Sequence, residues 1–222
     1  MNLFAYIRYF SFLAYNWNLR IALHLIQQEV KGERKYGINS TGAQKLFYLK
    51  KRGVDISHAT IYMPVSYLML DDVFNQIPLS SRNHFVDIGC GKGRALCLAL
   101  IHGFNKVTGI DFSRELCNVA KLNLAKVHQY NTGCLYEVIN NDAFYFDVPK
   151  DTDCIFLFNP FDEIILSGVV KNINQSLRQY PRTLRVIYAN PVYKELFTDA
   201  GFNEIYHTKK LKYLELSILC NK

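Results

Sequence analysis

Beyond residue 80, short apolar segments alternate regularly with longer amphipathic ones. The short segments have the length of strands and lie at His84–Ile88, Lys106–Ile110, Leu135–Asn140, Cys154–Phe158 and Leu184–Ala189. The longer segments carry apolar residues at helical spacing and span Gly93–His102, Ser113–Val127 and Asp162–Tyr180. Strict alternation of strand and helix predicts right-handed crossovers and a parallel sheet that is covered by helices on both faces.

The C-terminal end of the chain breaks this alternation. Phe202–His207 and Leu211–Leu219 are two extended stretches joined by Thr208-Lys209-Lys210, which leaves no room for a helix between them. We therefore expect a hairpin that adds an antiparallel strand to the sheet. The predicted fold class is α/β, with a seven-strand sheet that is parallel except for an antiparallel last strand.

The N-terminal segment has its own helical pattern. Apolar and aromatic residues recur at helical spacing at Leu3, Tyr6, Ile7, Phe10, Leu13, Trp17, Ile21, His24 and Leu25. They predict a helix that packs on the domain or on a second copy of the chain. A helix lying in a membrane interface is the alternative, because aromatic residues flanked by Arg8 and Arg20 also suit that setting. No apolar run reaches the length of a membrane span.

A polar, glycine-punctuated stretch over residues 31–60 predicts a connection with one short helix near Ala43–Lys51. Pro64 is expected at the first position of the next helix, where its missing N–H is not needed. Residues 1–60 are thus predicted as an N-terminal helical extension and connection, and residues 61–222 as the main domain.

Composition changes this picture little. Lys and Arg number 26 against 19 Asp and Glu, in small groups that fit either a solvated surface or a patch for nucleic acid or anionic membrane. The six cysteines form no CxxC pair and lie mostly in apolar runs, which predicts buried thiols in a reducing, cytoplasmic setting. The six histidines are scattered, so no metal site is predicted.

Polar residues follow each predicted parallel strand. They are Asp87-Ile88-Gly89, Asp111, Asn141-Asp142, Asn159-Pro160-Phe161 and Asn190-Pro191. Ligands of parallel α/β sheets bind beyond the carboxyl ends of the strands, where the strand order reverses. The sequence therefore predicts a binding site along this edge.

The stretch DIGCGKGR indicates close approach of the backbone to a ligand. Gly89, Gly91 and Gly93 allow backbone conformations that a Cβ would block, and the following helix offers free N–H groups to a carboxylate. A nicotinamide-binding loop has GxGxxG, but Arg94 stands at its third glycine position. Asp87 suits a cationic amino group, which a pyrophosphate lacks. A nicotinamide-dependent oxidoreductase is therefore the disfavoured alternative.

Four motifs in order, FVDIGCGKG, VTGIDFS, NNDAF and FLFNPF, resemble those of the class I, Rossmann-like S-adenosylmethionine-dependent methyltransferases. The resemblance covers about residues 60 to 220 and implies S-adenosylmethionine as cofactor. The first motif implies cofactor contacts from Asp87, Gly89, Cys90, Gly91 and Gly93. The second implies that Asp111 binds the ribose hydroxyls under Phe112, and the third that Asp142 binds the adenine amine beside Ala143. The fourth implies that Asn159, Pro160 and Phe161 lie at the transferable methyl group.

A finer likeness, carried by IYMPVSYLML, links the chain to seven-strand protein-lysine methyltransferases and their bacterial relatives. In these a Tyr-x-Pro loop, here Tyr62 and Pro64, covers the cofactor. The fourth motif departs from the Asn/Asp-Pro-Pro-Tyr of enzymes that methylate DNA bases and glutamine, because one proline is missing. The resemblance favours an amine acceptor, such as a protein lysine. A small molecule, an RNA, or cofactor binding without catalysis remain alternatives.

The residues themselves suggest roles within such a site. The side-chain oxygen of Asn159 and the Pro160 carbonyl can accept the N–H bonds of an amine, and Phe161, Tyr62 or Tyr67 can shelter its positive charge. Two cations flank the glycines: Arg94 is expected to pair with Asp87 or Asp111, and Lys92 is expected to point to solvent.

Overall fold

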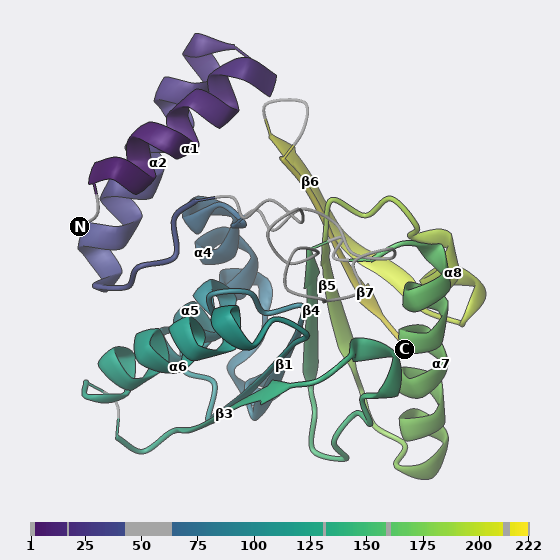
Figure 1. The fold of residues 1–222 in the computed structure, drawn as a ribbon. Coiled ribbons are helices and arrows are strands. Elements are labelled where there is room, and N and C mark those ends of the chain that lie inside the picture. Colours follow the sequence, from purple (N-terminus) through teal and green to yellow (C-terminus); the bar gives the residue numbers. More distant parts are fainter. Residues whose placement is uncertain are drawn as a thin grey trace.

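Seven strands form one sheet in the order β3-β2-β1-β4-β5-β7-β6, shown in Figure 1. The computed structural model describes residues 3–16, 18–42, 64–130, 132–158, 161–210 and 214–221. The strands are β1 His84–Ile88, β2 Lys106–Asp111, β3 Leu135–Asn140, β4 Cys154–Phe158, β5 Arg185–Ala189, β6 Asn203–Lys210 and β7 Leu214–Cys220. All neighbouring pairs are parallel except those of β7, which is antiparallel to both β5 and β6. The predicted seven-strand fold is confirmed.

The chain runs outward from the middle of the sheet in both directions. β1 pairs with β2 on one side and with β4 on the other, so the strand order reverses between β1 and β4. In sheets of this kind the reversal opens a crevice at the carboxyl ends of the strands. The glycine stretch follows β1 and therefore lies at this point.

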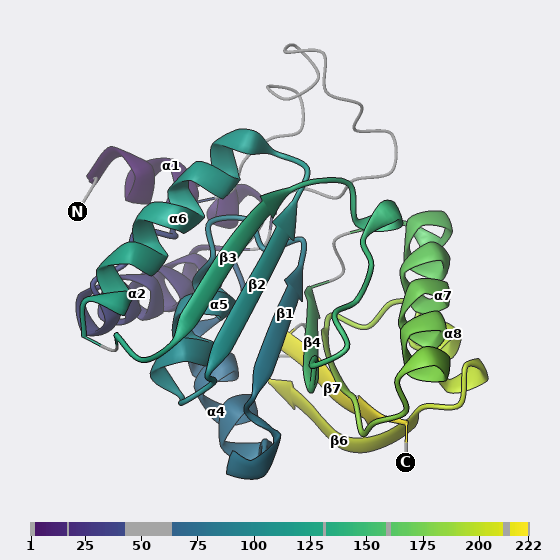
Figure 2. The ribbon, with the colours of Figure 1, turned by 90° about the horizontal axis from the view of Figure 1, so that it is seen from below.

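Helices cover both faces of the sheet, as Figure 2 shows. On one face lie α4 (Tyr67–Gln76), α5 (Arg94–Ile101) and α6 (Arg114–His128), and on the other α7 (Glu163–Gln179) and the short α8 (Glu195–Asp199). Each face has its own hydrophobic core, and alternate residues of β1 serve the two: Phe85 belongs to the first and Val86 to the second. This alternation follows from the period of two in a strand.

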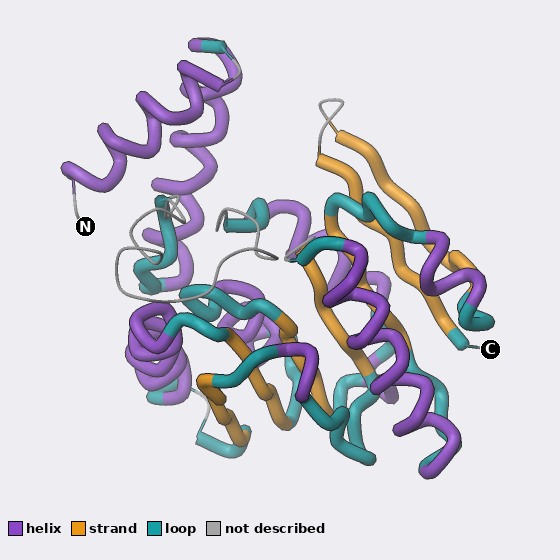
Figure 3. Tube along the Cα trace, turned by 45° about the vertical axis from the view of Figure 1, so that its right-hand side comes forward, coloured by secondary structure: helices purple, strands orange, loops and turns teal. Residues whose placement is uncertain are grey.

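The N-terminal segment forms a pair of helices where the sequence predicted one. α1 (Leu3–Asn16) and α2 (Leu19–Tyr36) pack against each other through Tyr9, Leu13 and Ala22, and we call them the α1–α2 hairpin. Asn18 ends the first helical pattern because its side chain caps α2, accepting the N–H of Ile21 at 2.9 Å. Figures 1 and 3 show the hairpin projecting from the α/β domain, with the C-terminal end of α1 and the N-terminal end of α2 furthest from it.

Three other boundaries differ from the expectations. α2 continues to Tyr36, so the first part of the predicted connection over residues 31–60 is helical. Pro64 lies outside α4, which begins at Tyr67 after the N-cap residue Ser66. The turn predicted at residues 208–210 is wrong, because β6 pairs with β7 as far as Lys210 opposite Leu214. The helix expected at Ala43–Lys51 lies outside the described residues, as does Tyr62.

All six cysteines are buried, as the sequence predicted, and within the described residues none forms a disulfide. They lie in helices and strands around the sheet, in the glycine stretch and, for Cys134, directly before β3, where they pack as small apolar side chains. None of the helices in the described part of the chain is long and apolar enough to cross a membrane.

Candidate functional site

The glycine stretch turns sharply at the end of β1 and is fixed to the end of β2. The three glycines have positive φ angles, 88° at Gly89, 53° at Gly91 and 76° at Gly93, in the region that favours residues without a Cβ. The backbone N–H groups of Gly89 and Cys90 both donate to the carbonyl of Ile110, at 2.8 and 2.9 Å. The loop is therefore held directly above the carboxyl ends of β1 and β2.

Close packing explains the glycine at the end of this loop and another in β2. A Cβ on Gly93 would lie 2.9 Å from the Cβ of Ala120 in α6, so glycine is needed for the start of α5 to approach that helix. A Cβ on Gly109 would lie 2.9 Å from the Cys90 Sγ. The Cys90 side chain thus packs onto β2, and only its backbone is placed to contact a cofactor.

Asp111, the last residue of β2, fixes the loop through a side-chain hydrogen bond. Its Oδ2 accepts the N–H of Gly91 and its Oδ1 accepts that of Ser113, each at 2.8 Å. Burial raises the pKa of Asp111 to about 6, although these two hydrogen bonds favour the charged form. Each carboxylate oxygen accepts more than one hydrogen bond, so this side chain can also receive ribose hydroxyls.

Asp87 lies one strand away and is buried too, with 3% of its surface exposed. Its pKa is raised well above the ordinary value, first by burial and then by the neighbouring charge of Asp111. No hydrogen bond or ion pair to its side chain is formed within the described residues. A cation that binds beside a buried carboxyl of this kind, such as the ammonium group of a methionine, strongly favours the ionised form of the carboxyl.

The end of β3 is joined to the end of β2 by hydrogen bonds from a side chain to backbone carbonyls. The Asn140 side-chain amide donates to the carbonyls of Asp111 and Phe112 at 3.0 and 2.8 Å, which ties β3 to the residues after β2. Asp142 is exposed and caps the single turn of 3₁₀ helix at Ala143–Tyr145, accepting the N–H of Phe144 at 2.9 Å. Ala143 is buried behind it.

The fourth motif follows the strand that pairs with β1. Asp87 lies opposite Phe156 in this pair, and Asn159 comes three residues after Phe156 in the sequence. Asn159 and Pro160 themselves lie outside the described residues. Phe161 is buried in the same apolar core as Ala143, on the α7 face of the sheet. The proposed roles of all three residues stay predictions.

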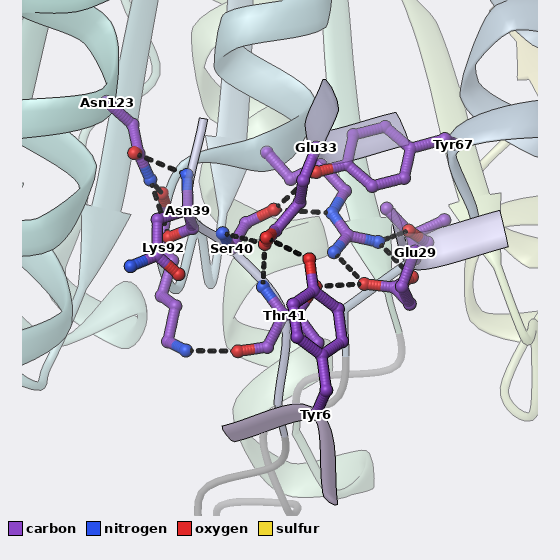
Figure 4. A network of polar contacts seen from close by, with 11 residues as sticks. Tyr6, Glu29, Glu33, Asn39, Ser40, Thr41, Tyr67, Lys92 and Asn123 are labelled. Carbon is purple, nitrogen blue, oxygen red and sulfur yellow. Dashed lines mark hydrogen bonds and ion pairs between the residues drawn. The ribbon is translucent and has the colours of Figure 1, made fainter. Parts of the chain in front are cut away.

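A network that the sequence did not reveal joins the α1–α2 hairpin to the cations beside the glycines (Figure 4). The Arg94 guanidinium forms an ion pair with Glu29 of α2, and the two side chains are 3% and 7% exposed. It also donates to the Ser40 hydroxyl at 2.8 Å and to the Val65 carbonyl at 2.6 Å, and lies 3.9 Å over the ring of Tyr67. The expected pairing of Arg94 with Asp87 or Asp111 is therefore wrong.

Tyr67 and Lys92 belong to the same network. The Tyr67 hydroxyl hydrogen-bonds Ser40 at 2.9 Å, so this ring serves Arg94 and the expectation that it shelters a substrate is wrong. Lys92 was expected to face solvent. Its Nζ instead donates to the Thr41 carbonyl at 2.6 Å, and burial lowers its pKa.

Glu33, one helical turn after Glu29, completes the network. It accepts the N–H groups of Ser40 and Thr41 at 2.8 and 2.7 Å and the hydroxyl of Tyr6 from α1. Burial raises its pKa, but these hydrogen bonds outweigh burial and hold the pKa below the ordinary value. A signal was present in the sequence: Glu29 and Glu33 are the only acidic residues before position 55.

Comparisons with known proteins agree with this geometry. Residues 85–180 match the family model of a methyltransferase domain. An RNA methyltransferase from Salinibacter ruber, solved with S-adenosyl-L-homocysteine, is 14% identical with a TM-score of 0.51, over 71% of this chain and 92% of its own. A SAM-dependent methyltransferase from Aquifex aeolicus is 19% identical with a TM-score of 0.53, over 69% and 89%. A search of curated proteins found no match.

The sheet order and the glycine loop are those of a class I, Rossmann-like fold, and residues 85–180 match a methyltransferase domain, so together they indicate an S-adenosylmethionine-dependent methyltransferase. S-adenosylmethionine is its cofactor. The residues fit this group, because two buried carboxyls flank a loop of positive-φ glycines. Asp87 would hold the ammonium group and Asp111 the ribose.

Proposed function

We propose that the protein transfers a methyl group from S-adenosylmethionine to an amine, and that a lysine side chain of a protein is the acceptor. The observation that carries the proposal is the position of the FLFNPF motif. Its first three residues end β4, which lies next to β1, so in the sequence Asn159-Pro160 comes directly after the strand adjoining Asp87 and the glycine loop. An amide oxygen and a backbone carbonyl there suit an acceptor that donates N–H bonds.

The reaction depends mainly on the alignment of the amine lone pair with the methyl group of the cofactor. Bound S-adenosylmethionine supplies a methyl group that is already electrophilic, because it is attached to a sulfonium. The amine nitrogen forms the new bond to carbon as the carbon–sulfur bond breaks, and the surplus proton of the amine passes to water. In our proposal, Asn159 and the Pro160 carbonyl accept N–H bonds and direct the nitrogen lone pair at near-attack distance. Phe161 limits the access of water.

The acceptor is testable by methyl-transfer labelling. The protein is incubated with S-adenosylmethionine carrying a labelled methyl group and a lysine-containing peptide library, and the products are analysed by mass spectrometry. Label on lysine side chains supports the proposal. Label on RNA or on small metabolites in a parallel reaction, with none on peptides, would refute the lysine acceptor.

Asn159→Ala separates catalysis from cofactor binding. We expect the variant to keep its affinity for S-adenosylmethionine in calorimetry while turnover falls at least tenfold, because only the alignment of the acceptor is lost. Asn105→Ala is a matched control, because Asn105 is an exposed asparagine that precedes β2, at the opposite edge of the sheet. Unchanged turnover in Asn159→Ala would remove the fourth motif from catalysis.

We further propose that the enzyme works in the cytoplasm. Its six cysteines are buried and form no disulfide within the described residues, which is typical of a protein kept in a reducing compartment. Fractionation of cells that express a tagged chain tests this location, and recovery from an oxidising compartment would contradict it.

A further inference from the structure

The outer surface of the α1–α2 hairpin combines exposed apolar side chains with cations. On α1 the exposed apolar residues are Phe4, Ile7 and Tyr15, with 72%, 56% and 91% of their surfaces exposed. They lie at helical spacing on the side opposite Tyr6, Tyr9 and Leu13, which are buried. On α2, Leu19 and Leu23 are 65% and 53% exposed. The hairpin therefore has an apolar outer face in addition to its buried one.

The charges of this surface all have one sign. Arg8, Arg20, Lys31 and Arg34 are exposed on the two helices, and none has an ion pair within the described part of the chain. The hairpin contains two acidic residues, Glu29 and Glu33, and both are buried in the network around Arg94. Because both carboxylates are buried in this network, all the charged side chains on the exposed surface of the hairpin are cations.

The position of the hairpin leaves this surface accessible. Both helices extend away from the sheet and its covering helices, and the C-terminal end of α1 and the N-terminal end of α2 are the parts furthest from the domain (Figures 1 and 3). Tyr15, Leu19 and Arg20 lie at these two ends. An aromatic, an aliphatic and a cationic side chain at one tip are the combination that inserts at a membrane surface.

We propose that the α1–α2 hairpin binds the protein to the surface of a membrane that contains anionic lipids. The cations contact the lipid headgroups, and the exposed apolar side chains enter the boundary between headgroups and acyl chains. The opposite charge of the lipids favours this occupant. A second copy of the hairpin would bring cation against cation. An RNA could stack its bases on Phe4 and Tyr15, but it offers no aliphatic surface to Ile7, Leu19 and Leu23.

Binding to vesicles tests the proposal on the full chain. We expect sedimentation with vesicles of phosphatidylcholine and phosphatidylserine, little with phosphatidylcholine alone, and weaker binding at high salt because surface charges are screened. The sole tryptophan, Trp17, lies in the sequence between the two helices, so its fluorescence should shift to the blue on binding. Equal binding to both kinds of vesicle, or to neither, would overturn the proposal.

Two sets of variants separate charge from apolar contact. Arg20→Gln, Lys31→Gln and Arg34→Gln together should weaken vesicle binding by about 100-fold, at roughly fivefold for each cation near an anionic surface. Leu19→Ser with Leu23→Ser should weaken it at least tenfold. Their matched controls lie on the α/β domain. They are Lys126→Gln, Lys171→Gln and Arg178→Gln together for charge, and Leu122→Ser with Ile164→Ser for exposed apolar residues.

Other occupants give different results in the same series. If the face joins two copies of the chain, sedimentation velocity will show a dimer that Leu19→Ser with Leu23→Ser dissociates, without vesicle binding. If it binds RNA, the cation variant will lose RNA and the leucine variant will not. Either result would refute the membrane surface. Circular dichroism of each variant checks that the helices are intact.

Discussion

Replacing Glu29 with glutamine removes one negative charge from the interior of the protein and leaves its partner in place. The Arg94 guanidinium, with 3% of its side chain exposed, then loses the carboxylate of its described ion pair. Of its described acceptors it keeps the Ser40 hydroxyl and the Val65 carbonyl, and both are neutral. The loss of this charged partner is unfavourable because the desolvation of the buried cation is then offset less well.

The expected loss of stability is large for one substitution. Removing one partner of a buried ion pair costs about 3–5 kcal/mol. For a chain of this length, 1 kcal/mol lowers the melting temperature by about 2–4 °C, so Glu29→Gln should melt about 10 °C lower than the unsubstituted protein. Glu204→Gln is the control. Glu204 pairs with Lys194 at 2.9 Å, but both side chains are about a third exposed, so that change should cost less than about 1 kcal/mol.

A double-mutant cycle shows whether the loss comes from the stranded charge. Arg94→Met alone leaves a buried carboxylate, whereas Glu29→Met with Arg94→Met leaves neither charge. We expect the double variant to be more stable than either single one, with a coupling of at least about 2 kcal/mol in denaturant unfolding. Single effects that add within about 0.5 kcal/mol would refute the reasoning, because the two residues would then act independently.

Three further predictions concern the cofactor site. Asp87→Asn should weaken S-adenosylmethionine binding about tenfold or more, which calorimetry measures. The cofactor-free protein should remain at least as stable in thermal melts, because the substitution removes a carboxyl group whose ionised form is disfavoured by burial. Affinity for S-adenosylmethionine should rise as the pH increases through about 6 and then level off. The reason is that the ionised form of Asp111 is the better acceptor for ribose hydroxyls, so binding favours loss of its proton. An affinity that does not change with pH would contradict this role. Gly93→Ala should destabilise the protein by about 2–3 kcal/mol, from a strained backbone and a contact of 2.9 Å with Ala120, whereas Gly103→Ala, with positive φ and open space, should cost about 1 kcal/mol.

Strands buried on both faces were predictable almost to the residue. His84–Ile88 and Cys154–Phe158 have the same bounds in the sequence analysis and in the structure, because a continuous apolar run ends where the chain leaves the core. The hairpin of β6 and β7 was less certain. Both ends of β6 are polar and exposed, so composition could not show that Lys209 and Lys210 belong to the ladder.

The N-terminal segment shows what a helical pattern cannot supply. The apolar spacing of residues 3–25 continues across Asn18, and only the cap at that residue reveals that the chain turns back. The orientation of Arg94 was equally hidden. Its choice between Asp87 and Glu29 depends on the folding of a helix that ends more than fifty residues earlier in the sequence.

The network around Arg94 affects the cofactor site because it holds two cations away from the acidic side chains there. Two cations flank the glycine loop, and each is held by the segment before residue 43, Arg94 by Glu29 and Lys92 by the Thr41 carbonyl. Neither forms an ion pair with Asp87 or Asp111, which lie buried beside the same loop. The protein therefore compensates the carboxylates of the hairpin with its own groups, whereas within the described residues Asp87 and Asp111 form no ion pair with a cation. Among these described residues, an ammonium group that enters the site meets two acidic side chains, and Arg94 is held away from them by Glu29, so the hairpin contributes to cofactor binding without having to contact the cofactor.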